Sequence, residues 1–167
     1  MKREGANAIR WITRTALLFA LVLVVQMLGM PQILTGTLVN ALLLLATSLV
    51  GITSGVVIGF FTPWVALSRG ILPPLLAPMI PFIMGGNALL VVIFALWMRK
   101  KSLPYEVVGI VLGAGAKYLL LSQAVRFLVE LPPPVARMMQ IPQLFTALLG
   151  GVVALLLHHV VGKALQI

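Results

Sequence analysis

The chain has 167 residues, of which 61% are hydrophobic and 9% are charged, whereas a soluble domain carries about 25% charged residues. This composition excludes a water-soluble globular fold, because twelve Lys and Arg and three acidic side chains cannot coat so much apolar surface. The net charge of +9 would suit a nucleic-acid partner, but the cations lie at the ends of apolar runs, where they orient a membrane protein.

The first apolar run predicts a membrane span over residues 9–28. Its length of about 20 residues is that of a full span, and no small-residue cleavage site follows it. We therefore interpret it as a retained helix and not as a signal peptide. Ala16 and Ala20 lie four residues apart and share one face, which either packs within the chain or docks a partner subunit.

A shorter apolar run predicts a second span over residues 38–50, preceded by the uncharged segment 30–37. Because the run is short for a perpendicular crossing, part of segment 30–37 is expected to fold back as a re-entrant loop against protein. Asn40 would then lie near the start of the span, where it either caps backbone groups or contacts a ligand.

A third span is predicted over residues 52–67, on which glycines recur every four residues at Gly51, Gly55 and Gly59. Such a face lets two helix backbones touch. Pro63 is expected to kink or end this helix. Trp64 either anchors the protein at the membrane interface or stacks on a ring-shaped ligand.

The remaining spans are predicted over residues 80–98, 105–128 and 143–161. Lys117 follows Glu106 by eleven residues, about 17 Å along a helix, which places it near the middle of the membrane. A lysine at that depth costs about 2.5–3.5 kcal/mol on insertion scales, so we expect it to face the interior with a partner.

Six spans place both termini on one side of the membrane, in a single domain over residues 1–167. Eight of the twelve Lys and Arg residues would lie on that side and three on the other, with Lys117 in the membrane. This bias predicts cytoplasmic termini. The fold class expected is therefore an all-α, six-helix integral membrane bundle.

The sequence carries no enzyme motif. It has no HExxH or Walker A pattern and no aspartate or cysteine, and Glu4, Glu106 and Glu130 are its only acids. We therefore expect no catalytic residue, no metal site and no cofactor. A few polar groups in an apolar bundle instead suggest a small-molecule site. The candidates are Asn40, Trp64, Asn87, Lys117, Tyr118, Ser122, Arg126 and Gln143.

Three segments resemble the substrate-binding S component of energy-coupling-factor (ECF) transporters, which take up vitamins and their precursors in prokaryotes. They are TGTLVNALLLL (35–45), FFTPWVALSRGILPP (60–74) and APMIPFIMGGNALLV (77–91). The resemblance covers nearly the whole chain, and TGxxVN and PFIxxGN are its most specific parts.

The resemblance implies a six-helix membrane protein with cytoplasmic termini that binds a vitamin-like molecule near the outer surface. It also implies a transmembrane coupling protein and two cytoplasmic ATPases as partners, with Ala16 and Ala20 matching the face that meets the coupling protein. Family pocket positions map onto Asn87 and Lys117, whereas the other site candidates come from helix faces. The implied mechanism is toppling of the loaded subunit in the membrane, driven by ATP hydrolysis in the partners.

Two alternatives stay open on the sequence. The first is an autonomous transporter or channel that acts as a homo-oligomer without ATPases, which would need a continuous polar stripe through the membrane. The second is a membrane enzyme or a scaffold subunit. The missing acids argue against an enzyme, and nothing in the sequence excludes a scaffold.

Overall fold

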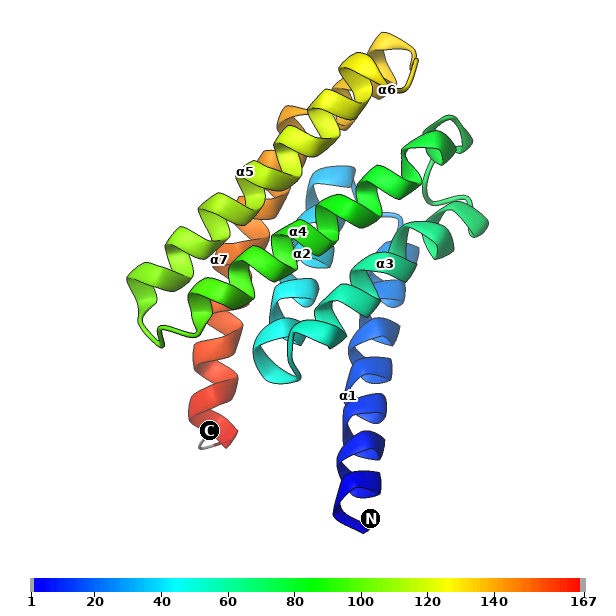
Figure 1. The fold of residues 1–167 in the computed structure, drawn as a ribbon. Helices are drawn as coiled ribbons and strands as arrows, with labels where there is room; N and C mark the ends of the chain where they lie inside the picture. Colours follow the sequence, from blue (N-terminus) through cyan, green and yellow to red (C-terminus); the bar gives the residue numbers. More distant parts are fainter. Residues whose placement is uncertain (1, 166–167) are drawn as a thin grey trace.

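The computed structural model describes residues 2–165 and places the side chains of residues 5–160. Within these residues all regular structure is helical, as expected (Figure 1). The long helices are α1 (Lys2–Met27), α2 (Gln32–Leu49), α3 (Ile52–Ser68), α4 (Ile80–Met98), α5 (Leu103–Phe127) and α7 (Ile141–Leu165). The short ones are η1 (Pro74–Met79) and α6 (Pro133–Met138).

Five apolar segments of the described chain are long enough to cross a membrane. They are Gly5–Met27, Gln32–Leu49, Pro74–Met98, Leu103–Phe127 and Pro133–Val160. The remaining predicted span, the third in chain order, corresponds to α3, which is apolar but has only 17 residues, about 26 Å against a hydrocarbon core of about 30 Å. A full crossing by α3 therefore stays a prediction.

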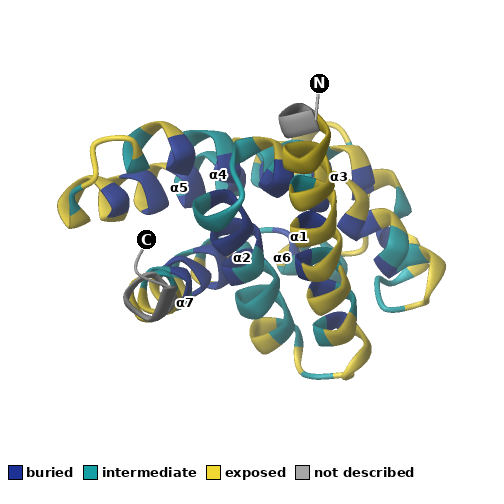
Figure 2. Ribbon diagram, turned by 90° about the horizontal axis from the view of Figure 1, so that it is seen from below, coloured by how far each residue is buried: buried dark blue, intermediate teal, exposed yellow. Residues whose placement is uncertain are grey.

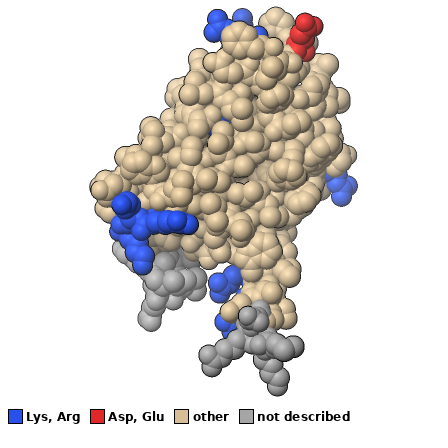
Figure 3. Space-filling view, in the orientation of Figure 1, with Lys and Arg blue, Asp and Glu red and all other residues tan. Residues whose placement is uncertain are grey.

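The molecule separates charge from apolar surface. Figure 3 shows Lys, Arg and acidic side chains near the extremities, with a broad face between them that is almost free of charge. Many large apolar side chains of the described residues are exposed, for example Leu17 at 63% and Val152 at 55%. Such a surface suits lipid, because it would aggregate in water.

Helix α2 lies at the centre of the bundle. It packs against α1, α3, α4 and α7, while α4 packs closely against α5 (Figure 2). Two clusters of buried side chains surround it: Leu44, Leu90 and Phe94 belong to one, and Leu43 and Ile58 to the other. This packing fixes the rotation of α2 and so decides which of its side chains face the interior.

The segment expected to be a re-entrant loop is mostly helix, so that expectation was wrong. Helix α2 begins at Gln32, and the backbone N–H groups of Leu34 and Thr35 already donate to the carbonyl of Pro31. Gly36 does not break the helix. It lies against α7, where a β-carbon at Gly36 would be only 3.1 Å from the side chain of Thr146, so the missing side chain lets the two helices pack closely. Packing against α7 thus outweighs the weak helix propensity of glycine.

Helix α3 differs from the expectation at Gly51, and at Pro63 one of the two expected alternatives does not occur. Gly51 precedes the helix with a φ of 125°, so only Gly55 and Gly59 form its close-packing face. Pro63 does not end the helix, which continues to Ser68. Proline removes the N–H that would bond four residues back, which leaves the carbonyl of Gly59 free for another donor.

The substitution Gly55→Ala is expected to destabilise the bundle. A β-carbon there would collide with Thr47 Oγ1 and lie 2.9 Å from Val91 Cγ1 and 3.1 Å from the carbonyl of Leu43. Overpacking of this kind costs about 1–3 kcal/mol, measurable as a lower thermal midpoint in detergent by circular dichroism. The matched control is Gly115→Ala, whose β-carbon meets nothing within 4 Å. Equal midpoints for the two variants would contradict the close approach of α2 and α3.

Candidate functional site

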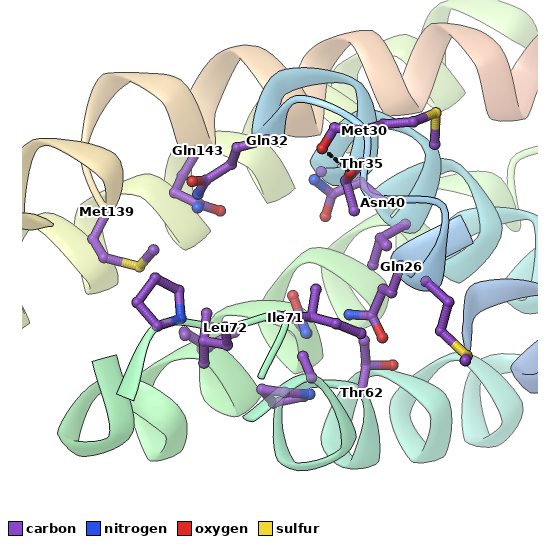
Figure 4. A pocket seen from close by; sticks show the side chains of 18 of the residues that line it. Gln26, Met30, Gln32, Thr35, Asn40, Thr62, Ile71, Leu72, Met139 and Gln143 are labelled. Carbon is purple, nitrogen blue, oxygen red and sulfur yellow. Dashed lines mark hydrogen bonds between the residues drawn. The ribbon is translucent and has the colours of Figure 1, made fainter. Parts of the chain in front are cut away.

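A cavity of about 520 Å³ lies in the half of the bundle away from the chain termini (Figure 4). It is bounded by the turn between α1 and α2, the segment between α3 and η1, and the first turns of α7. Six long helices contribute its polar lining: Gln26, Gln32, Thr35, Asn40, Thr62, Asn87, Lys117 and Gln143. The volume falls within the range of about 300–1,000 Å³ that is usual for small-molecule sites.

Lys117 is the charged residue of the cavity, and it is only 3% exposed. Its ammonium donates to Asn40 Oδ1 at 2.7 Å and to Asn87 Oδ1 at 2.8 Å. An ammonium has three N–H donors, so two are taken by asparagines and one is left for the cavity. The partners of Lys117 are neutral amides, and no carboxylate of the described residues is bonded to its amino group.

The two asparagines extend the hydrogen bonds of Lys117 to two further helices. Asn87 Nδ2 donates to the carbonyl of Gly59 on α3 at 2.9 Å. Asn40 Nδ2 lies 3.4 Å from Thr146 Oγ1 on α7, and that hydroxyl donates to the carbonyl of Gln143. One polar network therefore joins α2, α3, α4, α5 and α7 around the lysine.

Pro63 explains why Asn87 has a partner on α3. The carbonyl of Gly59 is the group that loses its helical donor at Pro63, and it receives the amide of Asn87 instead. A freed backbone group inside a membrane bundle needs such a replacement. The proline thus holds the Asn87 amide in one orientation, with its oxygen turned to Lys117.

Glycines make room for the lysine. A β-carbon on Gly86 of α4 would lie 3.1 Å from Lys117 Cγ, and one on Gly113 would lie 3.0 Å from the carbonyl of Leu90. Gly109, Gly113 and Lys117 are all buried on one face of α5, where the two glycines lie against α4. The expectation that Lys117 faces the interior with a partner is confirmed.

Comparison with known families adds to this geometry. A model of the substrate-specific component of ECF transporters matches residues 10–162. The chain belongs to this family. No curated protein and no solved structure matches the chain at a significant level.

ECF substrate-specific components are membrane proteins that bind the substrate of a transporter, and they are not enzymes. Membership implies association with an ECF coupling protein and ATPases. The resemblance seen in the sequence is thereby confirmed.

The structure brings four of the candidate site residues of this ECF component to the cavity. Asn40, Asn87 and Lys117 form the network at its inner end, and Gln143 lines it from α7. Asn40 was expected near a helix start, but it lies in the middle of α2 and is buried. The alternative that Asn40 caps backbone groups at a helix start is therefore wrong.

The other four candidates do not line the cavity. Trp64 is 52% exposed, and its Nε1–H donates to Met84 Sδ at 3.2 Å. Tyr118, Ser122 and Arg126 lie about 100° or more around α5 from Lys117, which turns them away from the lining. Arg126 is exposed beside the ring of Phe127. Contact of these four side chains with a ligand would need a different arrangement of the helices.

Sequence reasoning missed several lining residues, of which Gln26 is the most informative. It is 7% exposed, lines the cavity, and its Oε1 has no hydrogen-bond partner among the described residues. A buried amide at the end of an otherwise apolar helix was the available signal. For Thr62, another lining residue, the available signal was a polar side chain next to Pro63 in an apolar helix.

Proposed function

We propose that the chain captures a vitamin or vitamin precursor in the cavity and delivers it across the plasma membrane of a prokaryote. It would do so as the substrate-binding subunit of an ATP-driven ECF importer, with a transmembrane coupling protein and two cytoplasmic ATPases. The observation that carries this proposal is the ligand-sized cavity with an unpaired N–H of Lys117 facing it. Asn40, Asn87, Lys117 and Gln143 are the proposed substrate contacts.

The charge distribution supports an outward-facing cavity. The side that would carry both termini holds eight cations against three on the other side, which favours cytoplasmic termini. The cavity lies in the half away from the termini. In this orientation it receives substrate from outside the cell.

The inner half of the bundle argues against a channel. Beyond Lys117 the helices meet through buried apolar side chains, among them Leu44, Phe94, Ile110 and Ala154. A channel or autonomous transporter needs a polar path through the whole membrane. A polar cavity closed by an apolar core instead favours binding and delivery with partners.

The test is uptake of radiolabelled vitamins by cells that produce the chain with or without the coupling protein and ATPases. We expect uptake only when all components are present and when the ATPases are active. Liposomes that contain the purified chain alone should accumulate nothing. Accumulation by the chain alone would contradict the proposal and would favour an autonomous homo-oligomeric transporter.

A further inference from the structure

The composition of the cavity lining restricts the kind of molecule that the cavity can hold. Among the residues that the structure describes, its one charged side chain is Lys117, and none of its lining residues is acidic or aromatic. The apolar part consists of aliphatic side chains and methionines, for example Ile71, Leu72 and Met139 (Figure 4). Each of these properties restricts the chemistry of the molecule that fits.

The charge of Lys117 favours a ligand that carries a negative charge. A buried ammonium is costly unless an opposite charge is near it, and its two neighbours Asn40 and Asn87 supply only dipoles. No carboxylate lines the cavity among the described residues, so an anionic group of the ligand is the available source of a balancing charge. A carboxylate would accept the third N–H of Lys117 in a charge-assisted hydrogen bond.

The side-chain oxygen of Gln26 favours a ligand that carries a hydrogen-bond donor. The side chain of Gln26 is 7% exposed, it lines the cavity from α1, and its buried Oε1 has no hydrogen-bond partner in the described part of the chain. An unsatisfied buried carbonyl carries a desolvation cost that an O–H or N–H of a ligand would remove. The ligand therefore has a hydroxyl or amide donor in addition to its anionic group.

The absence of aromatic lining argues against a planar ring. Sites for flat heterocycles usually hold the ring between aromatic side chains. Trp64, which the sequence suggested for this purpose, and the nearest tyrosine along α5, Tyr118, both lie outside the lining. Aliphatic side chains and methionines adapt to a flexible chain instead.

From these three properties we infer that the substrate is a non-aromatic carboxylate that carries hydroxyl or amide N–H groups. The inference rests on the proposed function, because it assigns a substrate class to the same cavity. Lys117 holds the carboxylate, Gln26 accepts from the hydroxyl or amide donor, and the aliphatic side chains cover the carbon chain.

The experiment measures binding of probe pairs to the purified full chain by isothermal titration calorimetry in detergent. Two probes are aliphatic carboxylates with N–H or O–H donors, pantothenate and biotin, each paired with its neutral alcohol, panthenol and biotinol. Riboflavin and thiamine serve as heteroaromatic probes. We expect at least one carboxylate to bind, and its alcohol to bind roughly 10- to 150-fold more weakly, as the loss of a charge-assisted hydrogen bond predicts.

A pair of variants at Gln26 tests the sign of the ligand charge. Gln26→Glu places a negative charge in the cavity and should weaken the carboxylate by more than Gln26→Leu, which removes only the acceptor. A cationic or neutral ligand would not show this order. Thermal unfolding of each variant verifies that the helices still pack.

The outcomes separate this inference from the proposed function. Binding of riboflavin or thiamine, lost in Lys117→Met, with no binding of either carboxylate would overturn the substrate class and leave the importer intact. Equal affinity for a carboxylate and its alcohol would also overturn it. Binding of no probe at all would overturn the inference, whereas the importer itself fails only if ATPase-dependent uptake is absent.

Discussion

The substitution Lys117→Met is expected to remove substrate binding while the protein still folds. Methionine keeps the unbranched stem that fills the space opposite Gly86, but it removes the N–H that faces the cavity. Loss of a charge-assisted hydrogen bond lowers affinity by roughly 10- to 150-fold. The measurement is the amount of small molecule that copurifies with the protein, quantified by mass spectrometry per mole of chain.

The fold should survive because two effects oppose each other. The oxygens of Asn40 and Asn87 lose their donor, at a cost of about 1–3 kcal/mol for each buried acceptor. The variant also no longer buries an ammonium without a counterion, which offsets part of that cost. The amide nitrogens keep their own partners, including the carbonyl of Gly59.

The matched control is Tyr118→Phe, the next residue on α5. Tyr118 is partly buried but does not line the cavity, so this variant should retain as much small molecule as the parent chain. If Lys117→Met retained the parent amount, the cavity around Lys117 would not be the binding site. If both variants lost it, the cause would be a general disturbance of α5.

Local spacing was enough to predict the fold class and the core of the site. The length and apolar character of the spans indicate a helical membrane bundle, because backbone polar groups in lipid must bond within each helix. Lys117 could be placed inside because Gly109 and Gly113 share its face and the cost of lipid exposure is high. These arguments need only the geometry of a single helix.

Positions that depend on packing between helices could not be predicted in this way. The start of α2 was missed because contact of Gly36 with Thr146, 110 residues away in sequence, supports a helix that propensity alone disfavours. The stripe of Tyr118 was expected to reach the site, but it does not. The rotation of α5 within the bundle is set by the neighbouring helices, which the spacing of residues on one helix does not reveal. Gln26 was missed because a polar residue at a helix end usually marks the membrane interface.

The substitution Ala16→Leu is expected to stop ATP-driven uptake while leaving substrate binding unchanged. Ala16 and Ala20 are both exposed on α1, and neither lines the cavity. Only 17% of the apolar window of α1 is buried, against 28% to 44% in the other four candidate spans, so this helix leaves most of its surface free. Small side chains on a free helix face allow the close approach of a partner helix.

A leucine at position 16 would hold the partner helix of the coupling protein away. Overpacking costs about 1–3 kcal/mol, which corresponds to a roughly 5- to 150-fold weaker complex. The measurements are vitamin uptake by cells that contain all transporter components, and copurification of the coupling protein with the variant. Binding of substrate by the isolated variant should equal that of the parent chain.

The control for size is Leu21→Phe, which enlarges another exposed side chain of α1 about 140° around the helix from Ala16. This variant should transport normally, because only the alanine face has to meet the coupling protein. Normal uptake by Ala16→Leu would remove the docking role from this face. Loss of uptake in both variants would instead show that α1 tolerates no added bulk on either side, and docking would then involve more of its surface than the two alanines.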